Sequence, residues 1–339
     1  MTLRSLLVSA LLVTAALPAA ARGSDVIVQG TTDVRDAGLL DDVITPGFKQ
    51  AYPQYKLKYV AVGSGQALTN AEAGQGDAVL THSPDAEQQF VKAGYSASPF
   101  GPPVFYSDYV IVGPKDDPAH VFTEAPHDAA RAFELIALAG AAGKANFVSR
   151  GDDSGTNAKE LDIWKLTSAS LASSGEPGSG SRDAPWYHKA NAGQAATVQV
   201  AEQCPFKGGG CYDITDRGTF NRLVKNGSVG NLQVVSDTNE GAARGGRNLL
   251  LNEFRAYVVN PRKVHSVNVA GAKAFVDYLH AQAFRSKLAT YPTTSQPAFS
   301  THPPARSVSV TGVEKLFPQL IAEISTRCSL LTLALVHRL

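Results

Sequence analysis

Residues 56–83 read KLKYVAVGSGQALTNAEAGQGDAVLTHS, and this stretch decides the fold class. KLKYVAVG (56–63) and DAVLTHS (77–83) have the composition of strands, and the residues between them are typical of a loop and a helix. The alternation extends on both sides: DVIVQG (25–30) is expected to be a strand and PDAEQQFVKAG (84–94) a helix. This order predicts an α/β fold with a largely parallel sheet. In such sheets ligands bind at the carboxyl ends of the strands.

Two long β-rich runs bracket the middle of the chain. VFYSDYVIVGPKDDP spans residues 104–118, and FRAYVVNP spans residues 254–261. A segment enclosed by two such strands is typical of a domain inserted into another and joined to it by two crossings. We therefore expect one lobe from residues 25–110 and 256–315, with a second lobe, residues 111–255, inserted into it.

The chain beyond the second run is expected to return to the first lobe. AGAKAFVDYLHAQAFRSKL (270–288) has the apolar spacing of one amphipathic helix. TTSQPAFSTHPPARS (293–307) is rich in Pro, Ser and Thr, which predicts an irregular surface segment. The tail, residues 316–339, contains Cys328, and its sequence indicates no role.

The composition predicts a folded protein of about two domains without a general affinity for polyanions. Of 339 residues, 44% are hydrophobic and 18% are charged. Lys and Arg number 31 against 30 Asp and Glu, so the formal net charge is +1 at pH 7. This balance gives no basic field to hold nucleic acid or an anionic membrane. Any anion site must therefore be local.

The first 21 residues have the layout of a cleavable export signal. Arg4 precedes an apolar run from Leu6 to Leu17, and alanines follow at positions 19–21. The run is short for a membrane-spanning helix. No cysteine stands at its end to receive a lipid, so we expect a free protein in the periplasm or outside the cell.

Cysteine use fits an exported protein. Cys204 and Cys211 flank PFKGGG, a short glycine-rich loop that a disulfide could close. The alternatives are two free thiols or half of a metal site. No second Cys or His pair lies nearby in the sequence to complete four ligands, so a structural disulfide is favoured and no metal is expected.

FVSRGDDSGTNAKELDIW (147–164) carries a dense polar group directly before a helix-like run. One interpretation is an anion receptor, because helix N-termini present unpaired N–H groups and partial positive charge. The other is a capped helix with a surface arginine, in which Asn157 and Glu160 form a capping box.

Three segments share the order strand, small polar residues, helix, and we expect them to converge on a cleft. They contain Thr31 and Thr32, Ser64, and residues 149–156. Hydroxyl and backbone N–H groups bind anions by hydrogen bonding, and Arg150 adds a planar, always-charged donor. Asp152 is placed to hold that guanidinium without touching the ligand, and Gln194 at a later helix start is a further candidate.

Enzyme motifs are not found in the sequence. It has no GxSxG, HExxH, P-loop or GxGxxG opening a first βαβ unit, so we expect neither an enzyme nor a cofactor. His82 follows a predicted strand, where a structural role and a place near the cleft both stay open. Trp186 and Tyr187 are interpreted as packing residues. Arg150-Gly151-Asp152 matches an adhesion tripeptide, but so short a match has little specificity.

Five segments resemble, in order, segments of the tungstate-binding proteins of ABC importers. They are TTDVRDAGLLDDVITPGF, AVGSGQAL, FYSDYVIVGPKDDP, FVSRGDDSGTNAKELDIW and YDITDRGTF. The resemblance implies a type II periplasmic-binding-protein fold: two α/β lobes with mixed, mainly parallel sheets, two crossing strands and an oxyanion between the lobes. It also implies ABC permease transmembrane subunits as partners of a monomeric receptor. It carries over, as ligand contacts, Thr31, Thr32, Ser64, Arg150, Ser154, Gly155 and Thr156.

The chain departs from the family pattern at Asp33 and Val34, where further Ser or Thr residues usually follow the threonines. Asp33, like Asp152 and Gln194, is expected to contact the ligand-binding residues and not the anion itself. If it pairs with Arg35 or Arg150, tungstate or molybdate remains the favoured ligand. If it faces the anion and accepts a proton, a phosphate-type ligand is favoured. An exported phosphate or sulfate ester hydrolase that uses His82 and Asp33 is the remaining alternative.

Overall fold

The computed structural model describes residues 24–167, 184–291 and 298–303. Their strands are β1 (Asp25–Thr31), β2 (Lys56–Val62), β3 (Ala78–Thr81), β4 (Phe105–Pro114), β5 (Ala145–Ser149), β6 (Tyr187–Lys189), β7 (Gly210–Asp216), β8 (Leu232–Asp237) and β9 (Leu251–Val258). Their helices are α1 (Thr32–Asp36), the π-helix η1 (Leu40–Ile44), α2 (Thr45–Ala51), α3 (Ser64–Glu72), α4 (Pro84–Lys92), α5 (Val121–Glu124), α6 (Ala129–Ala141), α7 (Gly155–Lys165), α8 (Gln194–Gln203), α9 (Arg217–Lys225), α10 (Val269–His280) and α11 (Gln282–Leu288).

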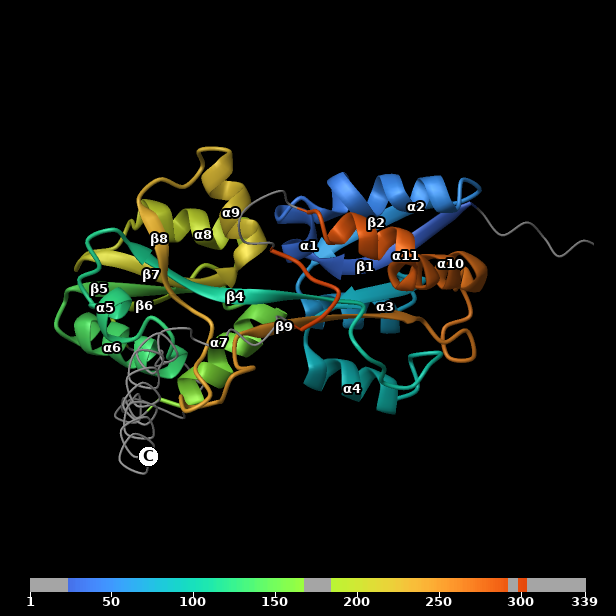
Figure 1. Cartoon of the computed structure of the whole chain (residues 1–339). Helices are drawn as coiled ribbons and strands as arrows, with labels where there is room; N and C mark the ends of the chain where they lie inside the picture. The colour runs from blue at the N-terminus through green and yellow to red at the C-terminus, as the bar shows by residue number, and fades with distance from the viewer. Residues whose placement is uncertain (1–23, 168–183, 292–297, 304–339) are drawn as a thin grey trace, which may run out of the picture. The chain divides into compact units, whose positions relative to one another are not determined.

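The strands are ordered β2-β1-β3-β9-β4-β7-β5-β6, with β8 paired to β4. Pairing is parallel at each end of this order, between β1 and its neighbours β2 and β3 and between β5 and its neighbours β6 and β7. It is antiparallel where β4 and β9 join the two groups. β4 and β9 pair with each other from Phe105 opposite Phe254 to Asp108 opposite Leu251 (Figure 1). The predicted α/β fold with two crossing strands is confirmed.

Each group of strands has its own apolar core. One core contains Val26 and Val28 of β1 together with Phe48, Phe105 and Phe254, all fully buried. The alternation of β1 explains this: its two valines face the core while Asp25 and Ile27 are exposed. Phe105 and Phe254 lie on the two crossing strands, and their rings stack with centroids 4.6 Å apart. The crossing strands therefore also contribute to this core.

The second core forms around the aromatic residues Phe133, Phe147 and Trp164. The rings of Phe133 and Trp164 lie 4.4 Å apart, and Trp164 is almost fully buried. Trp186 belongs to the same core, and Tyr187 packs against it, so both act as packing residues. Trp164 is on α7, so this core fixes the helix whose first residues were predicted to bind an anion.

Two sequence predictions about the C-terminal part were wrong. The run 270–288 forms two helices, because Ala281 has an extended backbone (φ −72°, ψ 148°) that ends α10. Residues 298–300 do not form an irregular surface segment: Phe299 is 2% exposed and packs edge-on against Phe105, and Ser300 bridges to Tyr106. Burying the large apolar surface of the Phe299 ring against the core is favourable, so this segment packs inward instead of staying in water.

Other sequence predictions fall outside the described residues. These are the export signal (1–21) and the tail (316–339) with Cys328. Within the part of the chain that the structure describes, no helix is long and apolar enough to span a membrane.

The structure joins Cys204 and Cys211 in a disulfide, with Cα atoms 5.5 Å apart. Cys204 ends α8 in a left-handed conformation (φ 41°), and Cys211 is buried on β7. The bond thus ties the end of a helix to the strand beside it.

We predict that this bond contributes stability only. Replacing both cysteines by alanine should lower the free energy of unfolding by about 2–3 kcal/mol, because a loop this short constrains the unfolded chain modestly. Urea denaturation measures the loss, and titration with the anion should give an unchanged affinity. A folded double variant that no longer binds its anion would contradict a purely structural role.

Asp213 is a buried carboxyl group in the middle of β7, opposite Val112 of β4 and Val148 of β5. It is 1% exposed, and neither carboxyl oxygen has a hydrogen-bond partner among the residues described. Burial raises the pKa of this carboxyl well above its usual range; the charge of Glu160 adds to the rise and that of Arg150 opposes it. The folded protein therefore retains a proton that the unfolded chain releases.

From this we predict a pH-dependent effect of Asp213→Asn. Unfolded Asp ionises near pH 4, about 3.9, whereas the folded group stays protonated to higher pH, so wild-type stability falls as pH rises through that window. The amide has no proton to lose, so the stability of the variant relative to wild type should increase from pH 4 to pH 8. Denaturant unfolding at several pH values measures this; a difference that stays constant with pH would refute it.

Candidate functional site

The three helix starts singled out in the sequence lie together. A Cβ atom placed on Gly63, just before α3, would stand 3.2 Å from the Cα of Ser154, and one on Gly65 would stand 2.9 Å from the carbonyl oxygen of Asp153. The loop after β2 therefore touches the loop after β5. Glycine is needed at these contacts because two backbones approach more closely than a side chain allows.

His82, directly after β3, also belongs to this meeting point. A Cβ atom on Gly155 would stand 2.6 Å from Nδ1 of His82 and 2.7 Å from its carbonyl oxygen. Only glycine fits at the first position of α7 without displacing the histidine. The carboxyl ends of β1, β2, β3 and β5 thus supply neighbouring residues, as expected of an α/β sheet.

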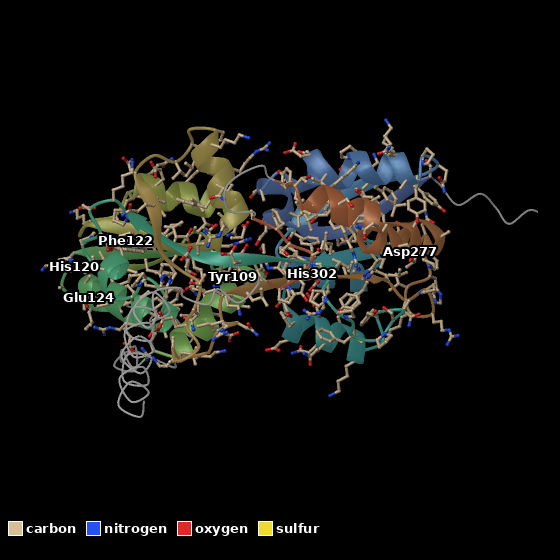
Figure 2. All side chains as sticks on the ribbon, viewed as in Figure 1. Tyr109, His120, Phe122, Glu124, Asp277 and His302 are labelled. Carbon is tan, nitrogen blue, oxygen red and sulfur yellow. A yellow bond between two sulfur atoms is a disulfide. The ribbon has the colours of Figure 1, made fainter. Side chains whose placement is uncertain are left out.

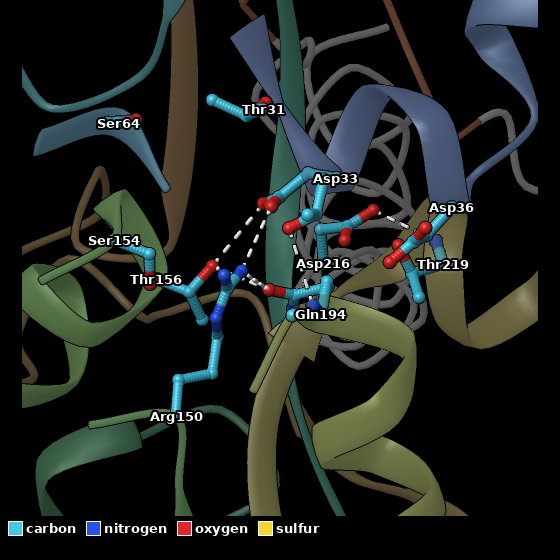
Figure 3. Close-up of polar contacts among 12 residues, drawn as sticks. Thr31, Asp33, Asp36, Ser64, Arg150, Ser154, Thr156, Gln194, Asp216 and Thr219 are labelled. Atoms are coloured by element: carbon cyan, nitrogen blue, oxygen red, sulfur yellow. Dashed lines mark hydrogen bonds and ion pairs between the residues drawn. The ribbon is translucent and has the colours of Figure 1, made fainter. Parts of the chain in front are cut away.

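Arg150 is the centre of the polar contacts. Its guanidinium is 1% exposed, so it is not the surface arginine of the capped-helix interpretation. Nη2 donates to Asp152 Oδ2 at 2.6 Å, and Nη1 donates to Asp33 Oδ1 at 3.2 Å and to Gln194 Oε1 (Figure 3). Nε, by contrast, has no hydrogen-bond partner within the described ranges. Burial lowers the pKa of the guanidinium, but the Asp33 and Asp152 carboxylates more than offset this, so Arg150 stays charged.

Asp33 reaches this guanidinium from the first turn of α1. It is 1% exposed, and its second oxygen, Oδ2, lies 3.3 Å from Thr156 Oγ1 and 3.3 Å from His82 Nε2. Arg35 pairs instead with its neighbour Asp36, at 2.7 Å. Of the two arrangements considered for Asp33, the structure has the one in which Arg150 compensates its charge.

Thr156 and Gln194 extend the cluster to a fourth helix start. Thr156 Oγ1 lies 2.9 Å from Gln194 Oε1, and Gln194 Nε2 donates to Thr215 Oγ1 at 2.7 Å. The backbone N–H of Gln194 donates to Thr32 Oγ1 at 3.3 Å. Gln194 therefore joins residues that follow β1 and β5 to a residue within β7.

The remaining predicted contact residues are buried around the same point. Thr31 donates its N–H to Tyr59 Oη at 2.7 Å, and its buried hydroxyl has no partner among the described residues. Ser64 Oγ accepts the N–H of His82 at 3.2 Å, which leaves its own proton free to be donated.

Ser154 Oγ accepts the N–H of Asn157 at 3.1 Å and caps α7. The expected capping box is therefore wrong, because the helix begins at Gly155 and its N-cap is Ser154, three residues before Asn157. Glu160 turns inward instead: it accepts from Trp164 Nε1 at 3.0 Å and from Tyr187 Oη at 2.6 Å. The cap and the anion receptor are thus compatible uses of one segment.

His82 is held by a buried polar network. Its Nδ1 lies 2.9 Å from both Tyr109 Oη and Asn252 Oδ1, and its ring stacks on Phe254 at 4.7 Å. Tyr109 is on β4, one of the crossing strands (Figure 2). Burial lowers the pKa of His82, while the nearby charge of Asp33 raises it; the net shift is downward and favours the neutral ring.

Asp216 brings another carboxyl group close to Asp33. It caps α9 by accepting the N–H of Thr219 at 2.9 Å. Burial raises its pKa well above the usual range, and the charge of Asp33 adds to this. In the described part of the chain, no group of three or more His, Cys, Asp or Glu residues is arranged to hold a metal ion.

Sequence reasoning missed Tyr109, Thr215 and Asp216 and left His82 undecided. His82 and Asp216 had a usable signal, because each stands at a strand end that precedes a helix. Tyr109 and Thr215 lie inside strands, where nothing local separates them from packing residues. The site brings hydroxyl, amide and guanidinium donors together with carboxylates around one buried point, and the donors suit the binding of a small anion.

Comparisons with known proteins show which family the chain resembles. Residues 15–282 match the model of a PBP superfamily domain. The tungstate-binding protein TupA of Peptoclostridium acidaminophilum is 34% identical over 272 residues, which cover 80% of this chain and 82% of that protein.

Two solved structures are similar in both sequence and fold. The tungstate-binding protein TupA of Desulfovibrio alaskensis G20 is 30% identical with a TM-score of 0.60, covering 84% of this chain and all (100%) of that one. A structure described as the tungstate ABC transporter of Geobacter sulfurreducens is 33% identical with a TM-score of 0.61, covering 79% of this chain and 98% of that one. The chain therefore belongs to the PBP superfamily, in the family that includes the TupA proteins.

Proposed function

We propose that this protein is the solute-binding receptor of an ABC importer and captures a tetrahedral oxyanion, tungstate or molybdate. The observation that carries the proposal is the buried Arg150 guanidinium, which lies where four helix starts meet and is held by Asp33, Asp152 and Gln194. The names of the TupA relatives support tungstate as the ligand, and the Geobacter structure described as a tungstate ABC transporter supports permease transmembrane subunits as the partners.

We assign the ligand contacts to two lobes, residues 25–110 with 256–315 and residues 111–255. Thr31, Thr32 and Ser64 come from the first lobe; Arg150, Ser154, Gly155 and Thr156 come from the second. A ligand that needs both sets is bound best when the lobes are together, so binding shifts the protein toward the closed state. The crossing strands β4 and β9 provide the hinge.

Export follows from the same proposal. We assign residues 1–21 to a cleaved signal and place the mature, monomeric receptor in the periplasm or outside the cell. It would deliver its ligand to the permease without a lipid anchor or a cofactor.

With Asp33 paired to Arg150, fully deprotonated anions remain better ligands than protonated ones. A carboxylate whose charge is compensated does not require a proton from the ligand, and tungstate, molybdate and sulfate have none to give near neutral pH. Of these, the larger tungstate and molybdate fill a pocket that sulfate leaves loose. A phosphate receptor is the alternative within the same class.

An ester hydrolase is the alternative from another class, because His82 and Asp33 lie 3.3 Å apart beside the same guanidinium. Such chemistry usually needs an activated nucleophile or a metal ion. Turnover of aryl phosphate or sulfate esters, lost in Arg150→Ala, would establish it.

We predict that calorimetry detects binding of tungstate and molybdate. Sulfate and phosphate should bind more weakly. Arg150→Gln should weaken tungstate binding at least about 30-fold, because loss of a buried charged partner costs roughly 2–5 kcal/mol. Arg222→Gln is the matched control: Arg222 is 42% exposed, pairs with Asp42, and should leave affinity unchanged.

Arg150→Gln also leaves two carboxylates without their cation, so circular dichroism must show that the variant folds. Thr156→Val, which removes one hydroxyl and keeps the shape, gives an independent test and should weaken binding by about tenfold. If wild type binds none of the four anions more tightly than about 1 mM, roughly −4 kcal/mol, the proposal fails.

A further inference from the structure

The donors assigned to the anion are already in contact with a group of the protein. Arg150 Nη1 and Thr156 Oγ1 lie 3.2 and 3.3 Å from the two oxygens of Asp33 (Figure 3). His82 Nε2 lies 3.3 Å from Oδ2. A carboxylate resembles part of an oxyanion: it has a negative charge shared by oxygens that only accept hydrogen bonds. Asp33 therefore makes the contacts that an anion would make.

Asp33 also makes them across the two halves of the fold. Its own helix, α1, follows β1, whereas Arg150 and Thr156 stand 117 and 123 residues later in the chain, after β5. A ligand that bridges the lobes stabilises the closed arrangement, and the Asp33 side chain forms the same kind of bridge.

The charges make sharing of these donors unfavourable. Arg150 faces two carboxylates, Asp33 at 3.2 Å and Asp152 at 2.6 Å. Burial favours the neutral form of His82, so the histidine adds no reliable positive charge. A tungstate dianion next to an ionised Asp33 would meet a like charge at close range, and salt screens this repulsion little in a buried site.

We propose that Asp33 is a specificity-determining residue that acts as a built-in competitor for the anion. It occupies Arg150 and competes with Gln194 Oε1 for the single proton of the Thr156 hydroxyl, and an incoming dianion must displace it from both residues. This inference rests on the proposed receptor function. It predicts that the chain binds tungstate more weakly than the same site without the carboxylate.

The test is calorimetric titration of the full-length mature protein with tungstate and, in parallel, with phosphate near neutral pH. Asp33→Asn keeps the shape and removes the charge, and it should bind tungstate at least about tenfold more tightly than wild type. Asp33→Thr supplies a hydroxyl donor in place of the carboxylate and should also bind tungstate more tightly than wild type. It replaces Asp33→Asn in the test if that variant is unstable.

Asp36→Asn is the matched control, because Asp36 lies on the same short helix but contacts Arg35 and the N–H of Ala195. It removes an equal charge without freeing Arg150 or Thr156. A change of less than about threefold in this variant, beside a tenfold gain in Asp33→Asn, supports displacement over a general charge effect.

The outcomes separate this inference from the receptor proposal. If wild type binds tungstate and neither Asp33 variant binds it more tightly, the competitor role is overturned. If Asp33→Asn loses phosphate while wild type binds phosphate and not tungstate, Asp33 accepts a proton from the ligand and the role is likewise overturned. If wild type and both variants bind no oxyanion, the receptor proposal itself fails, and the inference with it.

Discussion

Compensation of the buried Arg150 guanidinium is the interaction on which the site depends. Removing an ion of this kind from water costs several kcal/mol, and the loss must be offset by close opposite charges and hydrogen bonds. Asp152 supplies one partner from the neighbouring loop, Asp33 supplies a second from α1, and Gln194 supplies a third from α8. The cation thus draws together segments that are distant in the chain.

The fold makes this convergence possible. Parallel strands place their carboxyl ends at one edge, and a helix start follows each of β1, β2 and β5. Glycines at 63, 65 and 155 let these starts approach to backbone contact. Separate apolar cores hold each group of strands, while β4 and β9 connect them. The proposed lobe movement on anion binding would therefore need no rearrangement inside a core.

The sequence predicted those parts of the molecule that depend on local pattern. Strand and helix alternation, the two crossing runs and the helix starts are all visible as periodicity and small polar residues. What it did not predict depends on distant contacts: the Phe299 ring against Phe105, the break at Ala281, and Tyr109 beside His82. The partner of Asp33 could be narrowed to two arginines, but only the fold chooses between Arg35 and Arg150.

The most direct test of the account is to locate tungsten by anomalous scattering in crystals of the protein grown with tungstate. We predict one strong peak between the starts of α1, α3, α7 and α8, in contact with the guanidinium of Arg150 and the hydroxyl of Thr156, with the Asp33 carboxylate displaced from both. Tungsten found only at the protein surface, with Asp33 still bound to Arg150, would contradict it.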